Sequence, residues 1–162
     1  MFDFHILFTP NKQLMSTLGF DEYLDTTHFS QKISKNKITL IETTNENDVQ
    51  NGFIIYPFNG KLIYSAKLIR AVAEKKAAIE IPFAPILDMD PTGKASFISS
   101  ATKILKLCIK YNAHYIITSR ARNEFELKSA LDLISFGVCL GLSPDQSKSA
   151  ISNFPEMHTV KT

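Results

Sequence analysis

The sequence predicts a mostly parallel α/β sheet with crossover helices, and two observations support this fold class. Short apolar segments alternate with longer segments of helical periodicity, which is typical of strands joined by crossover helices. Several of the short segments are rich in isoleucine and almost continuously apolar, as expected of strands covered on both faces. With 162 residues, 44% hydrophobic content and no low-complexity tract, we expect a single domain over residues 1–162.

The expected strands follow in chain order: Phe2 to Phe8, Tyr23 to Thr27, Ile38 to Glu42, Phe53 to Tyr56, Ala78 to Phe83 and His114 to Thr118. The expected helices between them are Pro10 to Leu18, Thr44 to Gln50, Leu62 to Lys75 and Lys94 to Tyr111. Turn residues predict loops over residues 57–60 and 88–93. Six strands are fewer than the eight of a standard barrel, so the sheet is either incomplete or contains strands that the pattern does not reveal.

The long helix from Lys94 is the clearest amphipathic segment. At 100° per residue, one face carries Phe97, Ala101, Ile104, Leu105 and Cys108, and the opposite face carries Lys103, Lys106 and Lys110. A final helix is indicated by Ser143 as N-cap, Pro144 at the first helical position and Gln146 two positions later, which together form a capping box.

The composition restricts the class of protein. The chain has 18 basic and 16 acidic residues, and a net charge of +2 does not by itself predict a nucleic-acid binder. Cys108 and Cys139 lie among apolar residues and are expected to be reduced core residues. No apolar run approaches the ~20 residues of a membrane span, and the N-terminus lacks the features of a signal peptide. We therefore expect a soluble intracellular protein that does not contact membranes.

Basic residues follow the strand that ends at Thr118. Arg120 and Arg122 would lie at the carboxyl edge of the sheet, where α/β proteins bind ligands, and guanidinium groups suit phosphate. Lys128 on the same connection and Lys94 at the start of the long helix could join them on one rim. Three aromatic residues lie near these positions and either stack on unpaired bases or belong to the core: Tyr111, Tyr115 and Phe125.

The first strand carries the only pattern that suggests a metal. Asp3-Phe4-His5-Ile6-Leu7 is similar to the Asp-x-His-x-His start of the PHP phosphoesterases, but Leu7 replaces the second histidine. The other histidines, His28, His114 and His158, have no ligand spacing, so we expect no metal site. No nucleophile motif surrounds Ser119 or Ser135, so we expect no catalytic residues, and the Gly137 to Gly141 run is interpreted as close helix packing.

From about Ala66 to Glu156 the chain resembles the TIM-barrel-like protein subunit of archaeal and eukaryotic ribonuclease P. The matching segments, in chain order, are Ala77 to Pro85, the helix from Ala95, Lys110-Tyr111, Ile117-Thr118-Ser119, Asp132 to Val138, Gly141-Leu142, and Ser147 to Glu156. It implies a TIM-like (PHP-like) α/β barrel, shortened in its N-terminal half and either closed or incomplete.

The resemblance also implies a function. The chain would be a non-catalytic subunit of an endoribonuclease whose RNA, with magnesium, removes the 5′ leader of precursor tRNA; the protein itself would hold no cofactor. Its implied partners are the ribonuclease P RNA, precursor tRNA indirectly, and a small ferredoxin-like protein subunit. The implied location is the cytoplasm of an archaeon or the nucleus of a eukaryote.

The expected RNA-binding residues combine both lines of reasoning. Lys94, Lys110 and Lys128 match positions that are often basic in archaeal members of the family. Arg120 and Arg122 stand where relatives commonly have small or uncharged residues, and Ala84 replaces a common basic residue. The alternative function is a degenerate PHP-type metal-dependent phosphoesterase with Asp3, His5 and Arg120 at its mouth.

Overall fold

The computed structural model describes residues 2–25 and 39–152. Six strands lie in these residues: β1 (Phe2–Ile6), β2 (Glu22–Asp25), β3 (Thr39–Glu42), β4 (Phe53–Tyr56), β5 (Ala78–Pro82) and β6 (His114–Thr118). Each matches an expected strand, and β4 and β6 match residue for residue. The expected end of the second strand at Thr27 and the start of the third at Ile38 lie outside the described residues.

The strands follow one another in the cyclic order of a barrel that is left open. β3, β4, β5 and β6 form a parallel sheet in that order, while β1 and β2 form a separate parallel pair. β1 lies beside β6, and just past the two strands the amide of Leu7 donates to the carbonyl of Ala121 at 2.8 Å. Within the described residues β2 and β3 do not pair, so the expected shortened α/β barrel is confirmed in its incomplete form.

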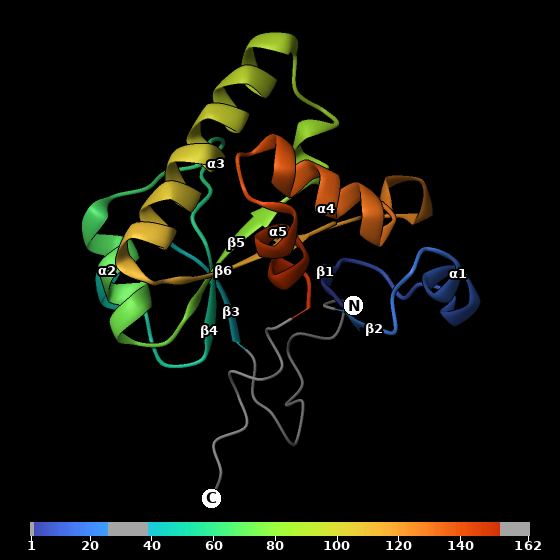
Figure 1. The fold of residues 1–162 in the computed structure, drawn as a ribbon, viewed down its shortest axis with the longest axis horizontal. Helices are drawn as coiled ribbons and strands as arrows, with labels where there is room; N and C mark the ends of the chain where they lie inside the picture. The colour runs from blue at the N-terminus through green and yellow to red at the C-terminus, as the bar shows by residue number, and fades with distance from the viewer. Residues whose placement is uncertain (1, 26–38, 153–162) are drawn as a thin grey trace, which may run out of the picture.

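The helices are α1 (Lys12–Thr17), α2 (Ala66–Glu74), α3 (Pro91–Tyr111), α4 (Ala130–Cys139) and α5 (Pro144–Ala150). Figure 1 shows α2 and α3 side by side to the left of the sheet, α4 and α5 in front of β6, and α1 with β1 and β2 at the right. Single 3-10 turns make up η1 (Glu46–Asp48), η2 (Ala84–Ile86) and η3 (Glu124–Glu126).

Three expectations about the helices are wrong. The helix expected from Leu62 begins only at Ala66, because the Ser65 side chain accepts from the amide of Leu68 and caps the helix there. The helix expected over Thr44 to Gln50 is only the turn η1, because the backbone is already extended at Val49 (φ −72°, ψ 124°). The expected loop 88–93 is in part helical, since α3 begins at Pro91 rather than at Lys94. Asp90 explains this start: its side chain accepts from the amide of Gly93 at 2.7 Å, which caps the helix one turn earlier.

The core forms where α3 packs, and the predicted apolar face is confirmed. All five residues of that face are buried: Phe97, Ala101, Ile104, Leu105 and Cys108. Cys108 is a free buried thiol as expected, but the expectation that Cys139 is a core residue is wrong, because it is exposed. Cys139 lies about 200° around α4 from the buried Gly137 and therefore faces away from the core.

Close packing at Gly137 joins α4 to α5, as expected. A Cβ at Gly137 would lie 2.1 Å from the Ser147 Oγ and 2.8 Å from the Ile117 Cδ1. The Ser147 hydroxyl is fully buried and donates to the carbonyl of Ile134 at 2.6 Å. The expected capping box of α5 is present, with Ser143 and Gln146 each accepting from the other's amide. No helix in residues 2–25 and 39–152 is long and apolar enough to cross a membrane.

Candidate functional site

The carboxyl edge of the four-stranded sheet is built around Arg120. At the end of β6 and just past it, the carbonyls of Thr118 and Ser119 accept from the amides of Phe83 and Ala84, both at 2.9 Å, so the backbone stays paired beyond β5. Arg120 then adopts a left-handed conformation with φ 47°. This conformation is uncommon for a residue with a Cβ and marks a site where surrounding contacts determine the backbone.

The Arg120 side chain contacts a residue from each of the other three strands. Its guanidinium forms ion pairs with Glu42 of β3 and, at 3.4 Å, with Glu80 of β5, and it lies 3.6 Å from the ring centroid of Tyr56 of β4. The Glu80 side chain is 0% exposed and also accepts from the hydroxyl of Thr118 at 2.7 Å. We call these five residues, Glu42, Tyr56, Glu80, Thr118 and Arg120, the edge cluster.

Arg120 is therefore enclosed and not exposed at the carboxyl edge. Its side chain is 13% exposed, and its donors are directed at carboxylates. A phosphate at this place would have to displace Glu42 or Glu80 from the guanidinium. Burial raises the pKa of Tyr56 well above its usual value, with Arg120 opposing and both glutamates adding to the rise. The phenol therefore stays protonated and cannot act as a base near neutral pH.

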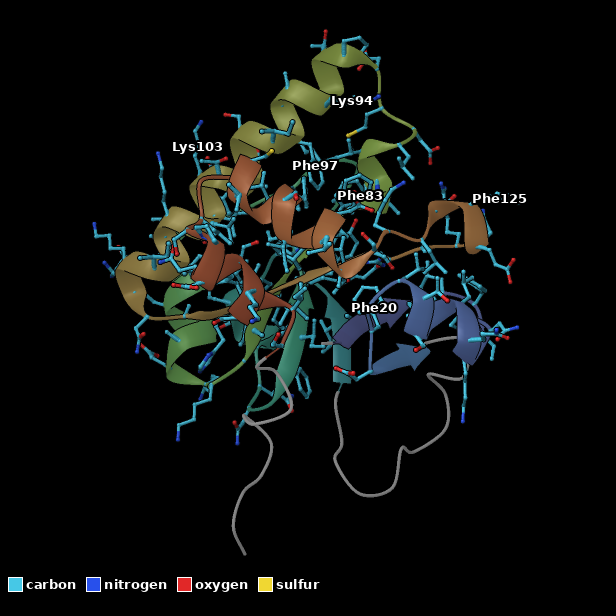
Figure 2. All side chains as sticks on the ribbon, turned by 45° about the vertical axis from the view of Figure 1, so that its right-hand side comes forward. Phe20, Phe83, Lys94, Phe97, Lys103 and Phe125 are labelled. Atoms are coloured by element: carbon cyan, nitrogen blue, oxygen red, sulfur yellow. The ribbon has the colours of Figure 1, made fainter. Side chains whose placement is uncertain are left out.

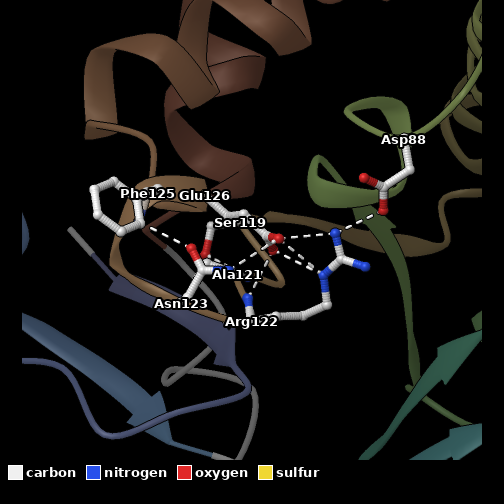
Figure 3. A network of polar contacts seen from close by, with 7 residues as sticks. All are labelled: Asp88, Ser119, Ala121, Arg122, Asn123, Phe125 and Glu126. Carbon is white, nitrogen blue, oxygen red and sulfur yellow. Dashed lines mark hydrogen bonds and ion pairs between the residues drawn. The ribbon is translucent and has the colours of Figure 1, made fainter.

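Arg122 connects two loops of the same edge. Its guanidinium pairs with Asp88, which follows β5, at 2.6 Å and with Glu126, which follows β6, at 2.8 Å. Its own amide also donates to Glu126 at 2.9 Å, and Figure 3 shows this network. The hydrogen bond from Arg122 lowers the pKa of Glu126, so that carboxylate stays ionised. The Arg122 side chain is 50% exposed, so it lies on the surface but with its donors in use.

The lysines of the expected site lie in different places. Lys128 is half-buried, with its Nζ 5.3 Å from the ring centroid of Phe83, beside the carboxyl edge. Lys94 is exposed on the first turn of α3, which extends past the sheet (Figure 2). Lys110 lies on the last turn of the same helix, so about 24 Å of helix separates it from Lys94. The structure thus brings Arg120, Arg122 and Lys128 to one edge, while Lys110 lies near the amino end of β6, away from that edge.

Of the three aromatic residues, only one is well exposed. Phe125 is 95% exposed in η3, so the alternative that it belongs to the core is wrong. Tyr115 is half-buried on β6. Tyr111 lies at the end of α3, where its hydroxyl accepts from Arg70 at 3.2 Å, and this hydrogen bond lowers the pKa of Tyr111.

Sequence reasoning missed Arg70 and three members of the edge cluster: Glu42, Tyr56 and Glu80. Glu80 did carry a signal, because a carboxylate inside the apolar strand Ala78–Pro82 must find a cationic or hydrogen-bonding partner. Arg70 carried none, since its contact with Tyr111 joins residues 41 positions apart.

Metal ligands do not gather in the described part of the chain. No group of three or more His, Cys, Asp or Glu side chains could hold a metal ion there. His114 is exposed at the start of β6, the end opposite the carboxyl edge, while His28 and His158 lie outside the described residues. Asp3 and His5 both lie on β1.

A comparison with known families shows which family the chain belongs to. The family model described as RNase P subunit p30 matches residues 31–160, which is most of the chain. This chain belongs to the ribonuclease P p30 subunit family. The match includes every residue of the edge cluster.

Curated relatives from the same family match part of this chain, and one solved structure has the same fold. The Ribonuclease P protein component 3 of Methanosarcina acetivorans is 30% identical over 89 residues, which are 55% of this chain and 37% of that protein. That of Thermococcus kodakarensis is 28% identical over 83 residues, which are 51% of this chain and 38% of that protein. The matched segment thus spans well under half of each relative. One chain of a cryo-EM structure of archaeal ribonuclease P with mature tRNA has the same fold, with a TM-score of 0.67 and 15% identity, covering 95% of this chain and 89% of that one.

Proposed function

We propose that this chain is a protein subunit of ribonuclease P that binds the enzyme's RNA and supports removal of the 5′ leader from precursor tRNA. The observation that carries the proposal is membership of the p30 family over residues 31–160. The fold shared with a chain of an archaeal ribonuclease P supports it. In this role the RNA performs the cleavage with magnesium, and the protein holds no cofactor of its own.

The chemistry of the edge cluster favours a structural role over catalysis. Glu80 is paired with Arg120 and the phenol of Tyr56 stays protonated, so neither side chain is poised to accept a proton near neutral pH. A phosphoesterase that used Arg120 to hold its substrate would first have to detach the guanidinium from Glu42 and Glu80. The cluster is better suited to hold four strands together.

Among the expected RNA-binding residues, we propose that Lys94, Lys110 and Lys128 contact the RNA. Lys94 and Lys110 are exposed, and none of the three lysines has a carboxylate within ion-pair distance in the described part of the chain. RNA contact by Arg120 and Arg122 stays a prediction from the sequence, and it would require both guanidiniums to leave their carboxylates.

We also propose that a small ferredoxin-like subunit covers an edge of the open barrel. In the described residues β2 and β3 each have a strand on only one side, and exposed strand edges promote association unless another chain covers them. Co-expression with that subunit should raise the thermal unfolding temperature by mass action and reduce light scattering. A chain that is monodisperse and equally stable without the partner would contradict the proposal that the partner covers the open edge.

We place the complex in the cytoplasm of an archaeon or the nucleus of a eukaryote.

Reconstitution tests the function directly. A ribonuclease P RNA, precursor tRNA and the partner proteins should release more 5′ leader at limiting magnesium when this chain is present, and the chain alone should release none. The phosphoesterase alternative predicts that the chain does not increase release of the 5′ leader and is active by itself. It requires about one equivalent of bound zinc, iron or manganese, and protein-only turnover of a phosphate ester that His5→Ala abolishes.

A further inference from the structure

The surface formed by α2 and α3 has an unusual charge. Residues 66–76 and 91–111 contain eight basic residues and one acidic residue, Glu74, which leaves 10 basic and 15 acidic residues for the rest of the chain. All eight basic residues are exposed: Lys67, Arg70, Lys75, Lys76, Lys94, Lys103, Lys106 and Lys110. None of them forms an ion pair with a described carboxylate, in contrast to Arg120 and Arg122. The near-neutral chain therefore has one strongly basic face.

Helix geometry arranges the lysines of α3 as a row. Lys103, Lys106 and Lys110 are spaced three and four residues apart, so they project from one side of the helix, opposite its buried face. Figure 2 shows Lys103 pointing outward from α3. The same helix contains no acidic residue over its 21 positions, so no neighbour on α3 neutralises the row.

Tyr111 joins this row to α2. Its hydroxyl accepts from the Arg70 Nη2 at 3.2 Å, and its ring centroid lies 4.8 Å from the Arg70 guanidinium carbon and 5.5 Å from the Lys110 Nζ. Two cations from two helices are thus held beside one aromatic ring, although their charges repel. Tyr111 offsets part of this repulsion, because the negative face of an aromatic ring attracts cations.

We propose that the α2–α3 face, with Arg70, Lys103 and Lys110 at its centre, binds the phosphate backbone of a structured RNA. Tyr111 is a positioning residue that fixes the guanidinium of Arg70. The inference rests on the proposed function and deepens it, because it assigns the main RNA contact to the helical face rather than to the carboxyl edge expected from the sequence.

The chemistry of the face favours RNA over an acidic protein partner. The centre of a protein interface is normally apolar and poor in lysine, whereas backbone contacts to nucleic acid come largely from Lys and Arg. Of the two exposed apolar residues of α3, Ile98 lies about 110° around the helix from the centre of the lysine row and nearer to the buried face, whereas Ile109 borders the row, about 60° from Lys106.

The test is filter binding of the purified chain to a ribonuclease P RNA transcribed in vitro, across a range of salt concentrations. The triple variant Arg70→Ala, Lys103→Ala, Lys110→Ala should bind about tenfold more weakly or worse, and the slope of log affinity against log salt should shrink by about three. The matched control is Lys12→Ala, Lys61→Ala, Lys148→Ala, which removes three exposed charges elsewhere and should leave the slope nearly unchanged. Both proteins should unfold like the wild type, because the altered side chains are exposed.

A separate experiment tests the positioning role of Tyr111. Tyr111→Phe keeps the ring but removes the acceptor for Arg70, so it should weaken binding in the wild type and have no further effect in Arg70→Ala. Equal losses in both backgrounds would show that Tyr111 contacts the RNA itself and would overturn this role.

The remaining outcomes separate the two proposals. A wild-type chain that binds RNA tightly while the triple variant binds equally well would overturn the inference and leave the proposed function standing. Equal weakening of RNA binding by the control variant would also overturn the inference and leave the proposed function standing, because binding would then depend only on net charge. A wild-type chain that binds no RNA would overturn both, and tighter binding to poly-glutamate than to the RNA would indicate an acidic protein partner instead.

Discussion

The guanidinium of Arg120, just past β6, lies 3.6 Å from the ring centroid of Tyr56, the last residue of β4. Between these two strands runs β5, whose buried Glu80 pairs with the same guanidinium. One cation thus links residues of three neighbouring strands, and through Glu42 it reaches the fourth. The four strands of the sheet thus share one charged side chain at their carboxyl edge.

Arg120→Ala should destabilise the protein strongly. It removes the ion pair between Arg120 and the fully buried carboxylate of Glu80, and breaking a buried pair costs about 3 kcal/mol or more. Urea unfolding at neutral pH measures the loss, and Arg122→Ala is the matched control. Because Arg122 is half-exposed, its loss should cost much less than the loss of Arg120. Equal losses for the two variants would show that Arg120 behaves as a surface charge.

Gly137→Ala should destabilise the contact between α4 and α5. The added methyl group would lie 2.1 Å from the Ser147 Oγ, and such overpacking costs about 1–3 kcal/mol. Adding Ser147→Ala should restore part of the loss by removing the nearest atom. Thermal unfolding of the two single variants and the double variant gives the coupling, and purely additive losses would contradict the packing explanation. Ser135→Ala on the exposed side of α4 is the control.

The two thiols should differ in reactivity. Burial raises the pKa of Cys108 to about 12, whereas Cys139 is exposed. Because the thiolate is the reactive form, iodoacetamide at pH 8 should label Cys139 in the folded protein and Cys108 only in denaturant. Mass spectrometry of the labelled peptides counts the sites, with Cys139→Ser as the control that should stay unlabelled. Rapid labelling of Cys108 in the native chain would contradict its burial.

The buried thiol should also make stability fall at high pH. The unfolded chain loses the Cys108 proton above the ordinary thiol pKa of 9.0, while the folded chain keeps it up to about pH 12. The free energy of unfolding should therefore decrease as pH rises above 9, by up to about 1.4 kcal/mol per pH unit from this group. Tyr56 and Tyr115, whose pKa values are also raised by burial, add to the loss only from about pH 10. Cys108→Ala should remove the part between pH 9 and 10, and an unchanged pH profile in that variant would refute the assignment.

The sequence predicted the strands well because periodicity and burial depend on local pattern. The buried face of α3, from Phe97 to Cys108, followed directly from the 3.6-residue repeat. The start of α3 was harder to predict, because Asp90-Pro91 is typical of a turn and equally typical of an N-cap followed by the first helical residue. Residues 44–50 were misread because their polar pattern did not reveal that the backbone straightens at Val49.

The candidate site was harder to predict, because it depends on contacts between distant segments. Sequence reasoning placed Arg120 at the carboxyl edge. It could not foresee that Glu42 and Glu80 would enclose this side chain, because Glu42 lies 78 positions before Arg120, and Glu80 lies 38 positions before its hydrogen-bond partner Thr118. The sequence also suggested a solvated face for Lys103, Lys106 and Lys110, and the structure agrees that they are exposed. Only the packing of α2 beside α3 adds Arg70 to this face.

The hydrogen bond from Leu7 to Ala121 joins two positions 114 residues apart in the chain. During translation, β1 therefore leaves the ribosome long before the strand beside which it finally lies. At typical synthesis rates the nascent β1–β2 pair waits on the order of ten seconds for β6. Through that interval its unpaired edge is available to other nascent chains, so production of this protein should depend on how well chaperones shield its first twenty-five residues.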